Sequence, residues 1–205
     1  MSAYAITEVG PGHQGRRMAL KDFEFARVRG SYIYELVRGI IVRTDLASYG
    51  HAMQMAMIRE HISLNRMDNG DRRALVLGCM ECKLLIWEME TERHPDLAVY
   101  LTKPATTRNA DIWSCWFPEI VVEVVSRASA ERDYVHKREE YWTLGVKEYW
   151  IVDAALEQIL ALRRGRTRWI ENALKRGDIL ETKLLPGFRL PCNDIFDAAG
   201  EEEDD

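Results

Sequence analysis

The feature that most restricts the fold is an apolar strand with one carboxylate in its middle, the run PEIVVEVVS over residues 118–126. Glu123 stands there between Val122 and Val124. An ionised carboxylate among β-branched residues loses its hydration, so the fold must give it a cation, a metal ion or several hydrogen-bond donors, or raise its pKa. Glu123 is therefore the first candidate for a functional residue.

A helix and a second apolar strand follow this run. Residues 130–144 predict a helix that stops at Gly145, and EYWIVD over residues 148–153 predicts the next strand. Only a short loop separates Ser126 from this helix. We therefore expect the helix to pack back across the sheet.

The remaining runs predict a mixed α/β fold. A hairpin should turn at Arg38 and Gly39, and three short runs after Asp153 should form an antiparallel extension. Further helices are predicted over residues 19–28 and 50–66, and strands over residues 74–78, 83–90 and 96–101. The expected order in the sheet and its helices is α-β-β-β-α-β, with an N-terminal hairpin.

Composition favours one globular domain. The chain has 205 residues, 47% hydrophobic and 30% charged, which is enough to bury a core. We expect a flexible lead over residues 1–17, a single domain over residues 18–197 and a disordered acidic tail over residues 198–205. Five of the 33 acidic residues end the chain, and the other 28 balance 28 bases. A neutral body neither indicates nor excludes a nucleic-acid partner.

Hydropathy argues against a membrane protein. No apolar run approaches the roughly 20 residues that a membrane helix requires, and the N-terminus lacks the order of a signal peptide. We expect a soluble protein in the cytoplasm.

The four cysteines leave two interpretations open. Only Cys79 and Cys82 have the Cys-x-x-Cys spacing, so a zinc site would need Cys115, Cys192 or a distant histidine. The flanking runs resemble strands, in which positions three apart face opposite sides. We favour reduced thiols in or near a core, with a zinc or redox protein as an alternative.

A lysine lies on the packing face of the helix over residues 130–144. Tyr134, Lys137 and Tyr141 follow one another at spacings of three and four. The stem of Lys137 could be buried while its ammonium reaches water. Alternatively, a helix that packs back across the sheet would bring this ammonium to Glu123.

Asp96 completes a possible triad. It follows Pro95 at the start of the strand LAVYL, where an acid often serves only to begin the strand. Together with Glu123 it would make an oxygen-rich site for magnesium or manganese. A lysine nearby could orient water or stabilise an anionic phosphorane.

These residues resemble the Uma-two family of restriction endonucleases in the PD-(D/E)XK nuclease superfamily. The resemblance rests on RHPDLAVYL, on PEIVVEVVS, on GVKEYWIVD, and on Asp133, Lys137 and Tyr141 in the helix. YELVRG and LLPGFRLP resemble its edges, so the likeness runs from about Met18 to Phe196. Each piece alone is common, whereas the combination is fairly specific.

The resemblance implies a restriction-endonuclease-like fold, with a four-stranded mixed sheet flanked by helices. Asp96, Glu123 and the carbonyl of Val124 would hold Mg or Mn, which activates water to cleave a phosphodiester. The usual Glu-x-Lys is absent because Val124 and Val125 follow Glu123. In families like this one the lysine has moved to the following helix, which matches Lys137. The family-like positions that could support the site are Glu35, His51, Asp133 and Tyr141.

Two groups could contact the substrate. Four arginines surround Gly165 in a predicted hairpin, where they would bind phosphates or simply be solvated: Arg163, Arg164, Arg166 and Arg168. Trp113, Trp116 and Phe117 precede the Glu123 strand and could stack on bases, cover the core or form a dimer surface.

The leading hypothesis is a metal-dependent endonuclease that acts on nucleic acid, with DNA as the first expectation and a homodimer as the default assembly. A catalytically inactive nuclease-like fold that binds nucleic acid or a protein is the second. The zinc or redox protein that uses Cys79 and Cys82 is the third.

Overall fold

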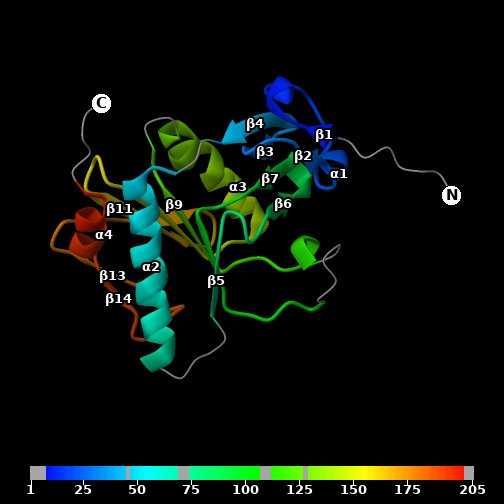
Figure 1. Ribbon diagram of the computed structural model, residues 1–205. Helices are drawn as coiled ribbons and strands as arrows, with labels where there is room; N and C mark the ends of the chain where they lie inside the picture. Colours follow the sequence, from blue (N-terminus) through cyan, green and yellow to red (C-terminus); the bar gives the residue numbers. More distant parts are fainter. Residues whose placement is uncertain (1–7, 45–46, 69–73, 107–111, 127–128, 201–205) are drawn as a thin grey trace. The chain divides into compact units, whose positions relative to one another are not determined.

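The computed structural model describes residues 8–44, 47–68, 74–106, 112–126 and 129–200. It contains two compact units (Figure 1). Unit 1 comprises residues 1–47 and 83–94, and unit 2 comprises residues 48–82 and 95–205. The prediction of one domain with a flexible lead stays a prediction. The acidic residues 201–205 of the predicted tail lie outside the described part.

Unit 1 contains a four-stranded antiparallel sheet in the order β4-β3-β7-β6. The predicted hairpin is present, because β3 and β4 pair about Arg38 and Gly39, both of which have positive φ. A separate parallel pair of two-residue strands, β1-β2, and the short helix α1 precede this sheet in the sequence. The strands are β1 (Glu8–Val9), β2 (Arg27–Val28), β3 (Ile33–Val37), β4 (Ile40–Thr44), β6 (Leu84–Ile86) and β7 (Thr91–Arg93), and the helices are η1 (Pro11–His13), α1 (Leu20–Phe23) and η2 (Trp87–Met89).

Two predicted elements of unit 1 are present but shorter than predicted. The helix expected over residues 19–28 ends after one turn, at Phe23, and the chain then extends into β2. The strand expected over residues 83–90 stops at Ile86, where a 3-10 turn begins, and Glu90 adopts a left-handed conformation with φ 49°. The chain therefore reverses, and β6 pairs with β7 in unit 1 instead of joining the larger sheet.

Unit 2 contains a six-stranded mixed sheet in the order β12-β11-β10-β9-β8-β5. Only β9 and β10 are parallel, and the other neighbours are antiparallel. The parallel pair needs a crossover, which the helical segment between them supplies. The strands are β5 (Leu75–Gly78), β8 (Leu97–Tyr100), β9 (Ile120–Val124), β10 (Glu148–Asp153), β11 (Gln158–Arg164) and β12 (Trp169–Lys175).

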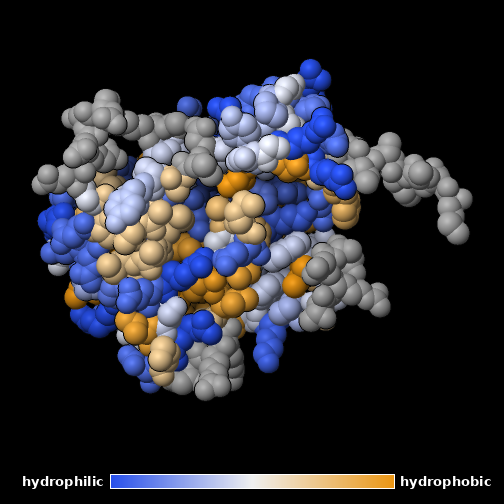
Figure 2. Space-filling view, in the orientation of Figure 1, coloured by the Kyte–Doolittle hydropathy of each residue, from blue (hydrophilic) through white to orange (hydrophobic). Residues whose placement is uncertain are grey.

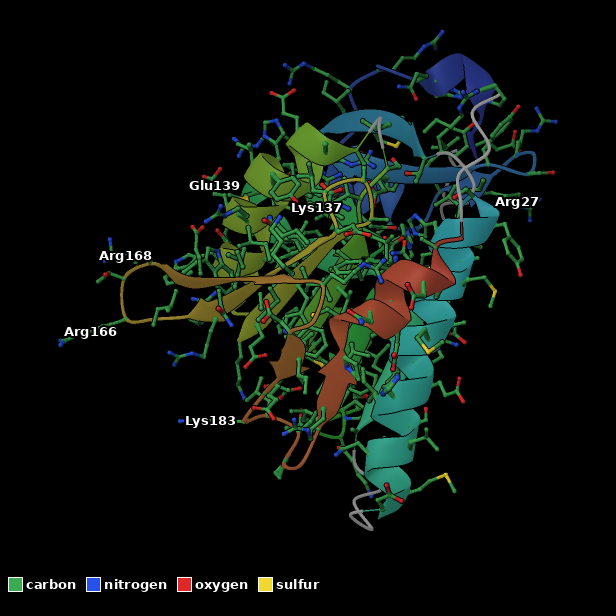
Figure 3. All side chains as sticks on the ribbon, turned by 90° about the vertical axis from the view of Figure 1, so that its left-hand side faces the viewer. Arg27, Lys137, Glu139, Arg166, Arg168 and Lys183 are labelled. Atoms are coloured by element: carbon green, nitrogen blue, oxygen red, sulfur yellow. The ribbon has the colours of Figure 1, made fainter. Side chains whose placement is uncertain are left out.

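Helices cover both faces of this sheet (Figures 1 and 3). The long helix α2 (Tyr49–Asp68) and the short helix α4 (Cys192–Ala198) lie on one side, with the hairpin β13 (Ile179–Glu181) and β14 (Arg189–Pro191). The π-helical turn η4 (Arg132–His136) and α3 (Lys137–Leu144) lie on the other. Gly145 ends α3 with φ 91°, as predicted. A 3-10 turn, η3 (Ile112–Ser114), precedes β9.

The main core of unit 2 lies between the sheet and α2. Ile58 and Ile62 of α2 are fully buried against Val122 and Val124 of β9 and Trp150 of β10. The outer side of α2 is partly apolar in Figure 2, since Leu64 is 50% and Met67 is 77% exposed. None of the described helices is long and apolar enough to cross a membrane.

Candidate active site

The side chain of Glu123 lies on the face of β9 that α3 covers. Side chains alternate along a strand, and Val122 and Val124 point into the core on the α2 side. Glu123 therefore points to the opposite side, where its side chain is only 3% exposed. The carboxylate is buried, as its valine neighbours indicated.

The helical segment after β9 brings a lysine to this carboxylate. Nζ of Lys137 lies 2.8 Å from Oε2 of Glu123 and 2.8 Å from Oδ1 of Asp133. Tyr141 donates a hydrogen bond from its hydroxyl to Oε1 of Glu123. In Figure 3, Lys137 points in toward the sheet, whereas Glu139 points outward. Lys137 and Tyr141 thus hold Glu123, and Asp133, one helical turn before Lys137, holds the lysine.

The turn η4 places Asp133 beside Lys137. It is π-helical, with the N–H of Lys137 bonded to the carbonyl of Arg132. π-Turns are rare and often occur at functional sites. The buried Tyr149 of β10 donates its hydroxyl to the carbonyl of Asp133 at 2.9 Å, which ties the turn to the sheet.

Burial raises the pKa of the Glu123 carboxyl to about 8. The Lys137 ammonium lowers this pKa, and the carboxylates of Asp96 and Asp133 raise it. If all four groups ionised, three carboxylates would face one ammonium. The cluster would then carry two negative charges, which a divalent cation would balance.

Asp96 ends the hydrogen-bond ladder between β8 and β9. The last pair of that ladder joins Leu97 to Val122, and Oδ2 of Asp96 accepts the N–H of Val124 at 2.7 Å. The N–H of the next residue, Val125, bonds to β10 instead. Since peptide groups alternate along a strand, the carbonyl of Val124 points to the side that carries Asp96. This side of β9 therefore gathers oxygen ligands.

His51 of α2 faces the other oxygen of Asp96. Its Nε2 lies 3.2 Å from Oδ1 of Asp96 and is buried, and no hydrogen bond reaches it from any described residue. Imidazole and carboxylate are both ligands of divalent transition metals such as manganese. A cation shared by these two side chains would satisfy both.

Side chains of the described residues do not by themselves make a complete metal site. Among the described residues, no three or more His, Cys, Asp or Glu side chains gather closely enough to hold one. The donors that such an ion could use are the carboxylate of Asp96, which lies beside His51, the carbonyl of Val124, and the carboxylate of Glu123 on the face that α3 covers. Mg²⁺ is typically bound through one or two carboxylates together with water and phosphate oxygens. The residues present fit such a cation.

The cysteines do not have the features of zinc ligands. The four cysteines, Cys79, Cys82, Cys115 and Cys192, are thiols outside any disulfide. Burial raises the pKa of the Cys82 thiol to about 12, and its Sγ donates to the carbonyl of Gly78. A zinc ligand must instead be a thiolate. Cys82 and Cys192 are buried, as expected for reduced thiols in a core, whereas Cys79 is half-buried and Cys115 is exposed.

Glu35 belongs to unit 1, where both of its carboxylate oxygens have partners. Its Oε2 lies 2.8 Å from Nη1 of the fully buried Arg93, and its Oε1 accepts the N–H of His94 at 2.9 Å. These bonds fix the end of β7. A role of Glu35 at the candidate site stays a prediction.

The four arginines of the hairpin separate into two kinds. Arg164 donates to the carbonyls of Val146 at 2.7 Å and of Tyr141 and Trp142, and its guanidinium lies 4.0 Å from the Trp142 ring. It therefore closes the C-terminal end of α3, whose last turn has no basic residue of its own. Arg163, Arg166 and Arg168 are exposed.

Replacing Arg164 with glutamine should lower the free energy of unfolding by about 1–3 kcal/mol, because several charge-assisted hydrogen bonds are lost. Urea unfolding followed by circular dichroism measures this. The matched control is Arg163→Gln, which removes an exposed neighbour and should change the unfolding free energy by less than about 0.5 kcal/mol. Equal effects of the two substitutions would contradict the capping role.

The tryptophans before β9 cover the sheet. Trp116 is buried, donates from Nε1 to the carbonyl of Thr102 at 2.8 Å, and lies 3.9 Å from the ring of Tyr100. Trp113 stacks on Trp116 with ring centroids 6.2 Å apart. These contacts favour a covering role over base stacking, and Phe117 is half-buried beside them in the chain.

Comparisons with known proteins identify the family and the fold. The family model Uma2, described as "Putative restriction endonuclease", matches residues 21–193. Among solved structures, the fold matches that of "a putative nuclease belonging to DUF820 from Anabaena variabilis ATCC 29413", with a TM-score of 0.68 and 13% identity. The match covers 89% of this chain and 99% of that chain, and it confirms the predicted nuclease fold. No curated protein matches.

Proposed function

The chain belongs to the Uma2 family of restriction endonuclease-like proteins, and from that premise we propose that it is a metal-dependent endonuclease that hydrolyses phosphodiester bonds of nucleic acid, DNA above all. The observation that carries the proposal is the buried contact of Lys137 with Glu123, which immediately precedes the residue whose N–H is bonded to Asp96. The lysine of the superfamily motif is missing after Glu123, and α3 supplies one in its place.

Each residue has a role in this reaction. Asp96, Glu123 and the Val124 carbonyl would hold a magnesium or manganese ion, which would supply a nucleophilic water and offset charge on the phosphoryl group. The Lys137 ammonium is held by two carboxylates and would orient the water or stabilise the anionic phosphorane. Tyr141 fixes the Glu123 carboxylate from its other oxygen. Asp133 keeps the lysine in place.

The proposal is tested by incubation of the protein with supercoiled, linear and single-stranded DNA and with RNA, in the presence of manganese. We expect nicking or cleavage that stops on addition of a chelator. The wild-type protein must exceed a Glu123→Gln preparation made in parallel, since a contaminating nuclease would be present in both. If the two preparations cleave to the same extent, the proposal is wrong.

Binding of manganese should depend on pH. Because the Glu123 pKa is about 8 in the free protein, a cation that binds below that pH must displace a proton. We expect the affinity to rise by up to about tenfold per pH unit from pH 6 to 8 and then to level off, because one proton is released per ion. Titration calorimetry in two buffers of different ionisation enthalpy measures this release. An affinity that is independent of pH would contradict it.

One observation favours the second function, a nuclease-like fold that binds without cutting. Both oxygens of Glu123 already have partners, Lys137 at Oε2 and Tyr141 at Oε1. A cation would have to share these oxygens or displace a partner. If manganese does not bind at millimolar concentration while nucleic acid does, this second function is the better one.

Two finer expectations accompany the leading proposal. A homodimer would suit an enzyme that cuts both strands of a duplex, and a cytoplasmic location would give it access to DNA. Light scattering after size-exclusion chromatography measures the first, and fractionation of cells measures the second.

A further inference from the structure

We infer that the end of the β11–β12 hairpin, together with Lys183, is a contact surface for the phosphodiester backbone of nucleic acid. This surface, the basic end, comprises Arg166, Arg168 and Lys183. It deepens the proposed function, on which its link to cleavage rests. It assigns the backbone contact to a region of unit 2 away from the candidate active site.

The three cations of the basic end are unpaired. Within the described part of the chain, the side chains of Arg166, Arg168 and Lys183 form no hydrogen bond or ion pair, and all three residues are exposed. In Figure 3 their side chains project to the same side of unit 2. Positive charges without protein partners on one side are the footprint that phosphate binding leaves.

Three other arginines at the surface of unit 2 contact carboxylates, unlike those of the basic end. Arg189 lies 2.5 Å from Glu181, and Arg176 contacts Glu157 at 2.8 Å. Arg59 contacts Glu81 at 2.8 Å. Since the chain without its last five acids is neutral, a group of unpaired cations is a local excess of charge.

The tight turn of the hairpin brings two of these cations together. The N–H of Gly165 donates to the carbonyl of Arg168 at 3.0 Å, so the turn closes within four residues. A Cβ at position 165 would lie 2.6 Å from that carbonyl oxygen, which only glycine avoids. The base of the hairpin is held by Arg164, which is bound to the end of α3. Arg166 and Arg168 therefore project from a rigid support.

Lys183 is held near the same end of the sheet. It follows Thr182, whose hydroxyl donates to Oε1 of the buried Glu148 at 2.7 Å. In the strand register, Glu148 of β10 lies opposite Arg163 at the base of the hairpin. The segment just after β13 is thus bonded to the start of β10, the strand beside the base of the hairpin.

The sheet register gives the separation between the basic end and the candidate active site. Glu123 lies three positions along β9 from Ile120, which is level with Glu148 and Arg163, and Arg166 is three positions further. Six positions at about 3.3 Å each are about 20 Å along the strands. That length corresponds to about six base pairs of duplex, at about 3.4 Å per nucleotide of a strand. A backbone that crosses the site could therefore reach the basic end within one turn.

The test is the salt dependence of binding to a fluorescein-labelled 20-base-pair DNA duplex, measured by anisotropy between 50 and 200 mM NaCl without divalent cations. Each phosphate contact contributes about 0.9 to the slope of log affinity against log salt. We expect the double variant Arg166→Gln/Arg168→Gln to have a slope smaller by about two. Between those concentrations the variant should lose about tenfold less affinity than the wild type.

The matched control is Arg189→Gln, which removes one exposed charge that already has a partner. It should leave the slope unchanged, and Lys183→Gln should reduce it by about one. Circular dichroism confirms that each variant is folded. A wild type that does not bind the duplex, or a double variant with the wild-type slope, overturns the inference.

The result is separable from that of the proposed function, because binding is measured without the metal. If the double variant has a reduced slope but the wild type never cleaves, the basic end is supported and the nuclease function is ruled out. Cleavage by a double variant that keeps the wild-type slope supports the nuclease and removes the basic end. The same titration with a labelled single strand tests the contacts a second time, since each phosphate contact then contributes about 0.7 to the slope of log affinity against log salt.

Discussion

Replacing Glu123 with glutamine should abolish manganese-dependent phosphodiester cleavage and leave the protein folded. The substitution keeps the shape of the side chain but removes the charge that would hold the cation. Lys137 keeps a partner in the variant, since its ammonium also lies 2.8 Å from Oδ1 of Asp133. The buried ammonium is therefore not left alone.

The measurement combines a cleavage assay with thermal unfolding. Cleavage should fall to the level of a control without protein, whereas thermal unfolding should stay cooperative. A folded Glu123→Gln protein that cleaves at the wild-type rate would show that this carboxylate is not part of the site. Asp96→Asn should also abolish cleavage, because it removes a charge that would hold the cation. The variant should stay folded, because the amide oxygen can still accept the N–H of Val124.

The dependence of stability on pH gives a check without metal or substrate. The pKa of Glu123 is raised in the folded chain above its unfolded value, so the folded state holds a proton that the unfolded state releases. Stability should therefore fall as pH rises from about 4.5 toward 8. Glu123→Gln should make the free energy of unfolding less dependent on pH in that window. An unchanged profile would contradict the raised pKa.

Replacing Lys137 with methionine should have a large effect on both stability and rate. The stem is kept, but Glu123 and Asp133 lose the cation that both contact. Breaking a buried pair in this way costs about 3–5 kcal/mol. The cleavage rate should fall by about 10²–10³-fold, since one charged group at the phosphoryl site is lost. Manganese affinity should change much less than the rate.

A double variant separates catalysis from folding. Lys137→Met/Asp133→Asn removes one buried positive and one buried negative charge, and uncharged replacements of a buried ion pair are often tolerated. Unfolding should return toward the wild-type free energy, whereas cleavage should stay low. Recovery of cleavage together with stability would mean that the lysine acts only as a structural partner.

Much of the site could be predicted because it follows from local rules. A carboxylate among valines had to be matched by a partner, and a lysine on the packing face of the next helix was within reach after a short loop. The structure brings these two side chains together at 2.8 Å. The strands β9 and β10 and the helix between them were predicted for the same reason, since their apolar runs are long and regular.

Other features depend on contacts distant in sequence. The run over residues 83–90 has the composition of a core strand, yet the left-handed Glu90 turns it back into unit 1. Arg164 looked like one arginine of a basic turn, and only the packing of α3 against β11 shows that it is a cap. The approach of His51 to Asp96 joins residues 45 positions apart, which no spacing rule contains.

The hydrogen bond from Val124 to Asp96 has a consequence for how activity is recognised in relatives. Because this carboxylate completes the edge of a strand, selection for folding alone would retain it in a protein that had lost catalysis. A buried lysine that needs two carboxylates brings no such benefit, since uncharged residues could replace it. Between two relatives that both keep Pro-Asp, the one that also keeps the equivalents of Asp133 and Lys137 is the better candidate for a working enzyme.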